Sequence, residues 1–320
     1  MRDTVPMTDL DNLEASLIGR RRYTREQVAE QSGVPADRAR QIWTSLGFPS
    51  MDDGVVAFTD ADVAAVKTFA ALVPETDSST QSQVDAGARS IGQAAARLSE
   101  WQADLIAEHL ADDGAPDAEQ TIAALSALQD YTWRRHLAAA LSRSMDSHGT
   151  TRSLLVGFAD MVGYTRLTRH LDLTELTDLL TAFESATTAA VVSHGGWVIK
   201  NVGDEVMFAA TDPRDGVQIA FAMQDAIHEA AQSISDMPEI RIGLAYGPVL
   251  TRFGDLYGPV VNLAARLTGV ARPNTILVDD DAAAVLDADA DLTTRHLRNV
   301  RVKGIPRLRP HVIRRRKTKG

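Results

Sequence analysis

Residues 153–160 read SLLVGFAD and residues 197–209 read WVIKNVGDEVMFA, and these two stretches decide the fold class. The first is an apolar run of strand length that ends in an aspartate. The second predicts two short strands with Gly203 and Asp204 at the turn between them, which is the pattern of a β-hairpin. A long helical pattern over 172–193 lies between the two stretches, so the order is strand, helix, strand, strand.

The alternation of strands and helices continues toward the C-terminus. A helix is predicted over 213–231, strands over 240–246 and 249–253, and a further helix over 260–270. The order β-α-β-β-α-β is that of the ferredoxin-like split pattern. It predicts an α+β domain whose sheet is rich in antiparallel pairs and carries its helices on one face.

Two aspartates stand where this topology brings chain segments together. Asp160 ends the first strand, and Asp204 lies at the tip of the hairpin that we expect beside it. Carboxylate oxygens without nearby His or Cys suit Mg²⁺ or Mn²⁺, held largely by substrate phosphates and water. Gly203 allows a tight turn and the close approach of a polyphosphate. Taken singly, Asp204 can also be a plain turn residue and Asp160 a helix cap.

A second pair of polar residues is predicted on the helix over 260–270. Asn262 and Arg266 are four residues apart, so they share one helix face. Together an amide and a guanidinium can hold a ribose oxygen and a developing phosphoryl charge. Alone, this spacing is common on exposed helices.

Three motifs together resemble the signatures of class III nucleotidyl cyclases. They are FADMVGYT at 158–165, IKNVGDEVMF at 199–208 and GDLYGPVVNLAAR at 254–266. They occur in the order of that family, and the resemblance covers about residues 150–315. It implies the ferredoxin-like catalytic domain of the family for residues 149–320.

The resemblance also implies a role for each motif residue. Asp160 and Asp204 would bind two divalent ions, Mg or Mn. Lys200 would donate to the adenine ring and Asp255 would accept from its amino group. Guanylyl cyclases of the family typically have Glu in place of this lysine, so the substrate implied is ATP and the products are 3′,5′-cyclic AMP and pyrophosphate.

The remaining implied roles lie in the C-terminal part of the domain. Asn262 would position the ribose, Arg266 would stabilise the transition state, and Lys303 would meet the terminal phosphate. In the family the metal ligands and the purine-binding residues face each other across a dimer, so a homodimer is implied. Tyr164 stands where Phe is common, and Arg252 is the candidate for an additional phosphate-binding arginine.

Residues 1–148 are predicted to form a helical regulatory domain. Short helices broken by turn signals occupy 20–73, and Ala-rich helical patterns occupy 85–146 as a helical hairpin or linker. The stretch 23–50 resembles the helix-turn-helix head of MerR-type regulators. This resemblance implies either DNA binding through Arg38 and Arg40 or a small docking module that keeps the shape. Histidines near the junction, namely His109, His136 and His148, suggest a pH-dependent control.

Composition narrows the function classes. The chain has 320 residues, no cysteine and a net charge of −10. Residues 1–148 hold 13 basic and 23 acidic side chains, whereas residues 149–320 are neutral. A disulfide framework, a thiol nucleophile and cysteine-bound zinc are excluded, and nucleic-acid binding by the acidic half is disfavoured. With no membrane-length apolar run and no signal-peptide pattern, we expect a soluble cytoplasmic protein without a membrane partner.

Two other function classes fit parts of the sequence. A helix-turn-helix transcription regulator with a nucleotide-binding second domain would use the first half for DNA. A diguanylate cyclase would share the hairpin VGDEV at 202–206. The hairpin lacks the second glycine of that family, and Lys200 also argues against it.

Overall fold

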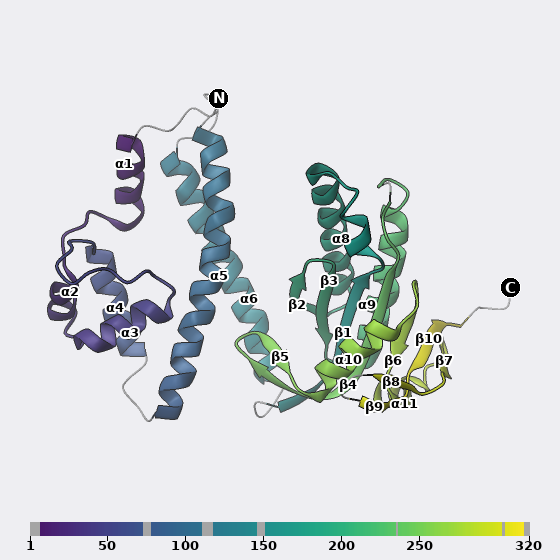
Figure 1. Ribbon diagram of the computed structural model, residues 1–320. Coiled ribbons are helices and arrows are strands. Elements are labelled where there is room, and N and C mark those ends of the chain that lie inside the picture. Colours follow the sequence, from purple (N-terminus) through teal and green to yellow (C-terminus); the bar gives the residue numbers. More distant parts are fainter. Residues whose placement is uncertain are drawn as a thin grey trace. The chain divides into compact units, whose positions relative to one another are not determined.

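The computed structural model describes residues 7–72, 78–110, 118–145, 151–234, 236–302 and 305–316. The chain divides into two compact units, Met1–Asp146 and Ser147–Gly320. Figure 1 shows a unit built from helices and a unit built on a sheet, which are described separately below. No helix within the described ranges combines the length and apolar character needed to cross a membrane.

The described part of the first unit consists of helices and the loops that join them. Its helices are α1 (Met7–Ile18), α2 (Arg25–Ser32), α3 (Ala36–Ser45), α4 (Asp60–Leu72), α5 (Ser78–Leu110) and α6 (Ala118–Met145). Helix α2 begins with a capping box, in which Thr24 and Gln27 bond each other's backbone N–H groups. Helix α1 lies ahead of the predicted helices at 20–73, and α5 begins at Ser78, before the helical pattern predicted from residue 85. One isolated antiparallel bridge joins Tyr23 and Phe58.

The long helices α5 and α6 leave large apolar side chains exposed. Trp101 on α5 is 55% exposed, and Leu128 and Trp133 on α6 are 58% and 57% exposed. These residues therefore do not form the core of the first unit, which lies under α2, α3 and α4 around Val28 and Phe58. Large exposed apolar side chains grouped on two helices are typical of surfaces that contact a partner.

The second unit is organised around a mixed sheet. Its strands are β1 (Thr151–Met161), β2 (Trp197–Val202), β3 (Glu205–Ala210), β4 (Ile240–Arg252), β5 (Asp255–Tyr257), β6 (Ile276–Val278), β7 (Leu292–His296), β8 (Val300–Val302), β9 (Ile305–Leu308) and β10 (His311–Arg315). The main sheet has the order β2-β3-β1-β4-β6-β10-β7, with β5 paired to β4, and β8 and β9 form a separate pair. The helices are α7 (Tyr164–Leu167), α8 (Leu173–Ser193), α9 (Pro213–Ala230), α10 (Pro259–Val270) and α11 (Asp280–Leu286).

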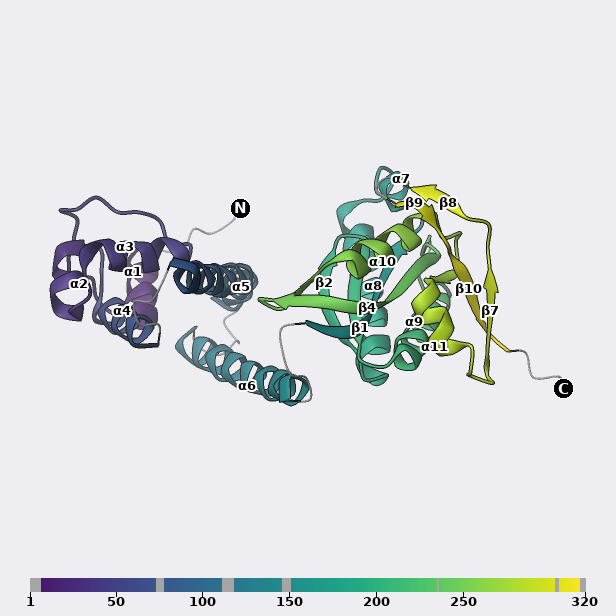
Figure 2. The same cartoon turned by 90° about the horizontal axis from the view of Figure 1, so that it is seen from below.

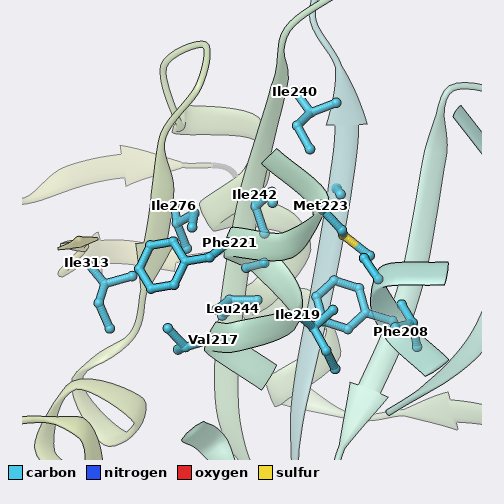
Figure 3. Packing of buried hydrophobic residues seen from close by; sticks show 14 of the residues in the cluster. Phe208, Val217, Ile219, Phe221, Met223, Ile240, Ile242, Leu244, Ile276 and Ile313 are labelled. Atoms are coloured by element: carbon cyan, nitrogen blue, oxygen red, sulfur yellow. The ribbon is translucent and has the colours of Figure 1, made fainter. Parts of the chain in front are cut away.

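The helices cover both faces of this sheet, so the prediction of helices on one face is wrong. Helices α8 and α9 lie side by side against one face (Figure 1), where Phe183, Ile219 and Phe208 belong to one buried cluster. Figure 3 shows part of this cluster, with the Phe221 ring reaching toward Ile313. Helix α10 packs on the opposite face through a second cluster (Figure 2). The two clusters follow from the alternation of apolar side chains along β1, which is buried on both faces.

The predicted strands at 240–246 and 249–253 are one strand. β4 runs without interruption and pairs with β1 from Ile240 to Leu250. Gly247 and Pro248, which fall in the break between the two predicted strands, lie inside the pairing opposite Leu154 and Ser153. Gly247 adopts a φ of 153°, and the fixed φ of proline is compatible with an extended chain, so the ladder continues.

Helix α10 approaches β4 closely because β4 has a glycine beneath it. A Cβ on Gly243 would lie 2.2 Å from the Thr268 nitrogen and 2.5 Å from the Ala264 oxygen, both backbone atoms of α10. We expect Gly243→Ala to push α10 outward and to destabilise the second unit by about 1–3 kcal/mol. Thermal unfolding of the full chain checks this result. Gly269→Ala, at a helical glycine with open space around its Cβ, is the matched control and should not lower the unfolding temperature.

Asp279 fixes the start of α11 and predicts a pH effect on stability. Its carboxylate accepts hydrogen bonds from the Ala282 and Tyr246 N–H groups at 3.0 and 3.2 Å. Burial raises the pKa of Asp279 to about 6, against 3.8 for a free carboxyl group. The folded state therefore binds a proton at Asp279 more tightly than the unfolded state does. The resulting contribution to the free energy of unfolding is present at low pH and is lost as pH rises through about 6.

Asp279→Asn should therefore gain stability relative to the natural chain between pH 4 and pH 7, by about 3 kcal/mol in total. The asparagine keeps an oxygen acceptor for the α11 backbone but cannot ionise. Unfolding temperatures measured across this pH range test the expectation, with the exposed Asp178→Asn as control. A constant difference between Asp279→Asn and the natural chain would contradict it.

Candidate functional site

Asp160 and Asp204 lie at the same end of the sheet. Asp160 is the penultimate residue of β1 and stands opposite Glu205 of β3. Asp204 immediately precedes β3, and its carbonyl oxygen accepts a hydrogen bond from the Met161 N–H at 3.0 Å. Gly203 makes this turn possible with a φ of 61°, a conformation that favours glycine. The local fold thus brings two acidic side chains together from segments 44 residues apart, 160 and 204.

The electrostatics at this end of the sheet are those of crowded carboxylates. Burial raises the pKa of Asp204, and the nearby charge of Asp160 adds to this shift. Burial also raises the pKa of Glu205, with further contributions from Asp160 and Asp204. Arg241 opposes both shifts. A site with several acids in partial burial favours the binding of positive charge.

Arg241 supplies positive charge there in this structure. Its Nε lies 2.6 Å from an Asp160 carboxylate oxygen, and its Nη1 lies 3.5 Å from the carbonyl oxygen of Gly269 at the end of α10. Sequence reasoning missed this arginine, because the pairing of Asp160 with Arg241 across β1 and β4 is set by tertiary register. The candidate chosen instead, Arg252, lies with its guanidinium 5.0 Å from the Phe253 ring centre.

The donor set fits a divalent cation that a substrate helps to hold. Mg²⁺ commonly takes one or two carboxylates together with phosphate oxygens and water, and Asp160 and Asp204 supply such a pair. Over the described ranges, no cluster of three or more His, Cys, Asp or Glu side chains could hold a metal ion. The chain therefore offers part of a coordination shell rather than a complete cage.

Lys200 and Asp255 form a second charged pair. The Lys200 Nζ, from β2, lies 2.6 Å from an Asp255 carboxylate oxygen on β5. The other oxygen of Asp255 accepts from the Leu256 N–H at 2.8 Å, which fixes the carboxylate. The side chains are 44% and 28% exposed, so both groups are within reach of a ligand. The two residues are 55 positions apart in sequence, and the fold joins them in one hydrogen bond.

Asn262 and Arg266 lie on the exposed face of α10. The helix begins after Gly258 with Pro259 in its first turn, and it buries Ala264 and Leu267 against the sheet. Asn262 and Arg266 are both exposed and one turn apart. Lys303, the other predicted phosphate contact, lies outside the described residues.

Comparisons with known proteins identify the family of the chain. The adenylate and guanylate cyclase catalytic domain family matches residues 147–315. An adenylate cyclase of Streptomyces coelicolor is 39% identical over 83% of this chain and 72% of its own length. An adenylate cyclase of Glutamicibacter nicotianae is 33% identical over 98% of this chain and 83% of its own.

A solved structure is also similar to part of the chain. The adenylyl cyclase CyaB from P. aeruginosa is 26% identical over 53% of this chain and 98% of its own, with a TM-score of 0.46. The extent of the family match and the identity to the Streptomyces and Glutamicibacter proteins establish the relationship. The chain belongs to the adenylate and guanylate cyclase family, the class III nucleotidyl cyclases.

Proposed function

We propose that this protein is an adenylyl cyclase that converts ATP to 3′,5′-cyclic AMP and pyrophosphate. The observation that carries the choice of ATP is the ion pair between Lys200 and Asp255. Adenine presents an acceptor at N1 beside a donor at its amino group, and this lysine and aspartate offer the complementary donor and acceptor. Guanine presents the opposite order, so the same pair would face mismatched groups. The relatives named as adenylate cyclases support the proposal.

The reaction is an in-line displacement at the α-phosphorus. A bond forms from the ribose 3′-oxygen to phosphorus, the bond to the pyrophosphate oxygen breaks, and the 3′-hydroxyl proton is released. Divalent cations, for which we favour Mg²⁺ or Mn²⁺, would lower the pKa of the hydroxyl and neutralise phosphate charge when bound. Asp160 and Asp204 would hold them, and the charge of Asp160 is near enough to raise the pKa of Asp204.

The chain's cationic and amide groups would act on the other parts of the nucleotide. Asn262 would orient the ribose, and Arg266 would offer positive charge where it develops at the transferred phosphoryl group. Lys303 would contact the terminal phosphate. Arg241 would exchange its Asp160 partner for phosphate oxygens when the substrate arrives, because a guanidinium binds phosphate with good geometry.

The active form would be a homodimer with composite sites. Asn262 and Arg266 face outward on α10, as expected of groups that serve a nucleotide held by another protomer. The exposed apolar residues of α5 and α6 are suited to further contacts between protomers.

We also propose that the protein is located in the cytoplasm.

The first unit would regulate the catalytic unit rather than bind DNA. We also propose that residues 23–50 form a MerR-like helix-turn-helix head. The packing of α2, α3 and α4 around one small core supports this proposal. Arg38, a candidate for DNA contacts, is only 7% exposed and lies 3.9 Å from Asp85. A buried arginine beside an acid cannot reach phosphates. His136 is exposed on α6, whereas His148 and the side chain of His109 lie outside the described part.

A nucleotide-product assay tests the proposed activity. The full chain is incubated with ATP or GTP, with Mg²⁺, Mn²⁺ or EDTA, and the products are separated chromatographically. We expect cyclic AMP and pyrophosphate in equal amounts, none with EDTA, and a strong preference for ATP. Cyclic GMP as the main product, or a linear dinucleotide, would overturn the proposal.

A further inference from the structure

A pocket of about 430 Å³ lies on the sheet face that α10 covers, beyond the C-terminal end of that helix. Four arginines line it, namely Arg272, Arg295, Arg298 and Arg314. The floor is apolar and includes Leu277 and Val312, and the lining contains no aspartate or glutamate. Of the predicted substrate and metal residues that the structure describes, none lines this pocket.

The strand register explains why positive charge gathers there. Val312 of β10 stands opposite Leu277 of β6 on one side and opposite Arg295 of β7 on the other. Arg314 follows Val312 by two residues, so it projects from the same face of the sheet. Arg295 and Arg314 are therefore diagonal neighbours across β7 and β10, where like charges repel each other.

The four arginines lack the acidic partners that neighbouring arginines have. Arg315, which projects from the other face of β10, lies 2.8 Å from Asp225, and Arg309 lies 3.7 Å from Asp280. Within the described part of the chain, none of the four pocket arginines has a carboxylate oxygen within 4.0 Å. All four side chains are exposed, so the charge faces the pocket and solvent without compensation.

We infer that this pocket binds a diffusible ligand with clustered phosphate groups. Guanidinium groups bind phosphate oxygens in pairs, and four of them around one concave site match several negative charges. The volume falls in the range of small-molecule sites, and the apolar floor can accept the organic part of a ligand. The ligand is either a nucleotide or an inorganic polyphosphate. The inference does not rest on the proposed cyclase activity.

Arginine modification with phenylglyoxal locates such binding residue by residue. The full chain in EDTA is treated with the reagent alone, with inorganic tripolyphosphate or with ATP, and modified peptides are quantified by mass spectrometry. We expect each anion that binds to slow modification of the four pocket arginines by at least fivefold, while the exposed Arg169 reacts unchanged. The two anion arms distinguish the inorganic from the nucleotide source.

Three outcomes would overturn the inference. The four arginines could react equally with and without either anion, Arg169 could be protected to the same degree, or the four could be unreactive from the start. The last outcome would mean that another chain segment or a second copy already fills the pocket.

Calorimetric titration with tripolyphosphate gives an independent measurement. Arg295→Gln combined with Arg314→Gln should weaken binding at least tenfold, whereas Arg309→Gln combined with Arg315→Gln, which removes two arginines outside the pocket, should not. If circular dichroism shows that the first pair does not fold, Arg298→Gln alone replaces it, with an expected threefold loss. Asp160→Ala should retain full binding, so a failure of the proposed cyclase activity leaves this test intact. Loss of binding in Asp160→Ala, or none in the pocket variants, would contradict the inference.

Discussion

Asp160→Ala is expected to lower cyclase activity by about 10³-fold while the chain stays folded. The change removes a carboxylate that we assign to the divalent cations, and metal stabilisation of developing charge is worth several kcal/mol in such reactions. Arg266→Ala is expected to lose a similar amount, because its guanidinium would act on the same phosphoryl group. Initial rates with ATP and Mn²⁺, and circular dichroism as a check on folding, measure both variants.

Mixing the two inactive chains should restore activity. If each site takes Asp160 from one protomer and Arg266 from the other, a mixed dimer has one intact site and one doubly defective site. Random assembly makes half of the dimers mixed, so about a quarter of the natural activity should return. Asp160→Ala mixed with Asp204→Ala is the control and should stay inactive, because both changes affect the same half of the site. Recovery in this control, or none in verified Asp160→Ala/Arg266→Ala dimers, would contradict shared sites.

Exchanging the members of the Lys200–Asp255 pair should strongly lower the use of ATP. In the natural chain the two opposite charges lie 2.6 Å apart. The double variant Lys200→Asp with Asp255→Lys keeps one charge of each sign at these positions, so we expect the fold to persist. The order of donor and acceptor toward the purine is reversed, and mispaired polar groups are strongly selected against. Since the pair is partly exposed, we expect kcat/KM for ATP to fall by about 10²-fold or more and the preference to move toward GTP.

The single variants separate recognition from folding in this experiment. Lys200→Asp alone places two carboxylates together and should lower both stability and activity. If the exchanged pair restores stability but not ATP turnover, the pair serves base recognition. A folded exchanged variant that still prefers ATP would show that the purine is bound elsewhere.

The parts of the site that were predictable depend on local sequence. Asp204 follows Gly203 in a hairpin, and Asn262 and Arg266 share a helix face, so short-range geometry is enough to place them. Asp160 could be placed beside the hairpin because the order of strands and helices restricts the topology. The charged contact between Lys200 and Asp255 depends on the pairing of β5 with β4, which local sequence does not indicate.

The parts that were not predictable depend on packing between distant segments. Arg241 stands 81 residues after Asp160, and nothing in its own neighbourhood indicates that the two lie in register. Gly247 and Pro248 carry a local turn signal that the ladder between β1 and β4 overrides. The face chosen by α10 depends on Gly243, whose missing side chain matters only once the helix is docked. The MerR-like head and the roles assigned to the site residues, Lys303 included, stay predictions.

The ion pairs of Arg241 with Asp160 and of Lys200 with Asp255 have a kinetic consequence. Each holds a group that we assign to the nucleotide, so under that assignment an incoming nucleotide has to displace the ion pair. The favourable contacts that these groups make with the nucleotide are therefore partly offset by the loss of the two ion pairs. This lowers the net affinity for the nucleotide and raises KM without slowing the chemical step. A cyclase built in this way would respond to ATP over a higher concentration range. Between turnovers, the ion pairs would also weaken the binding of other anions to the nucleotide site.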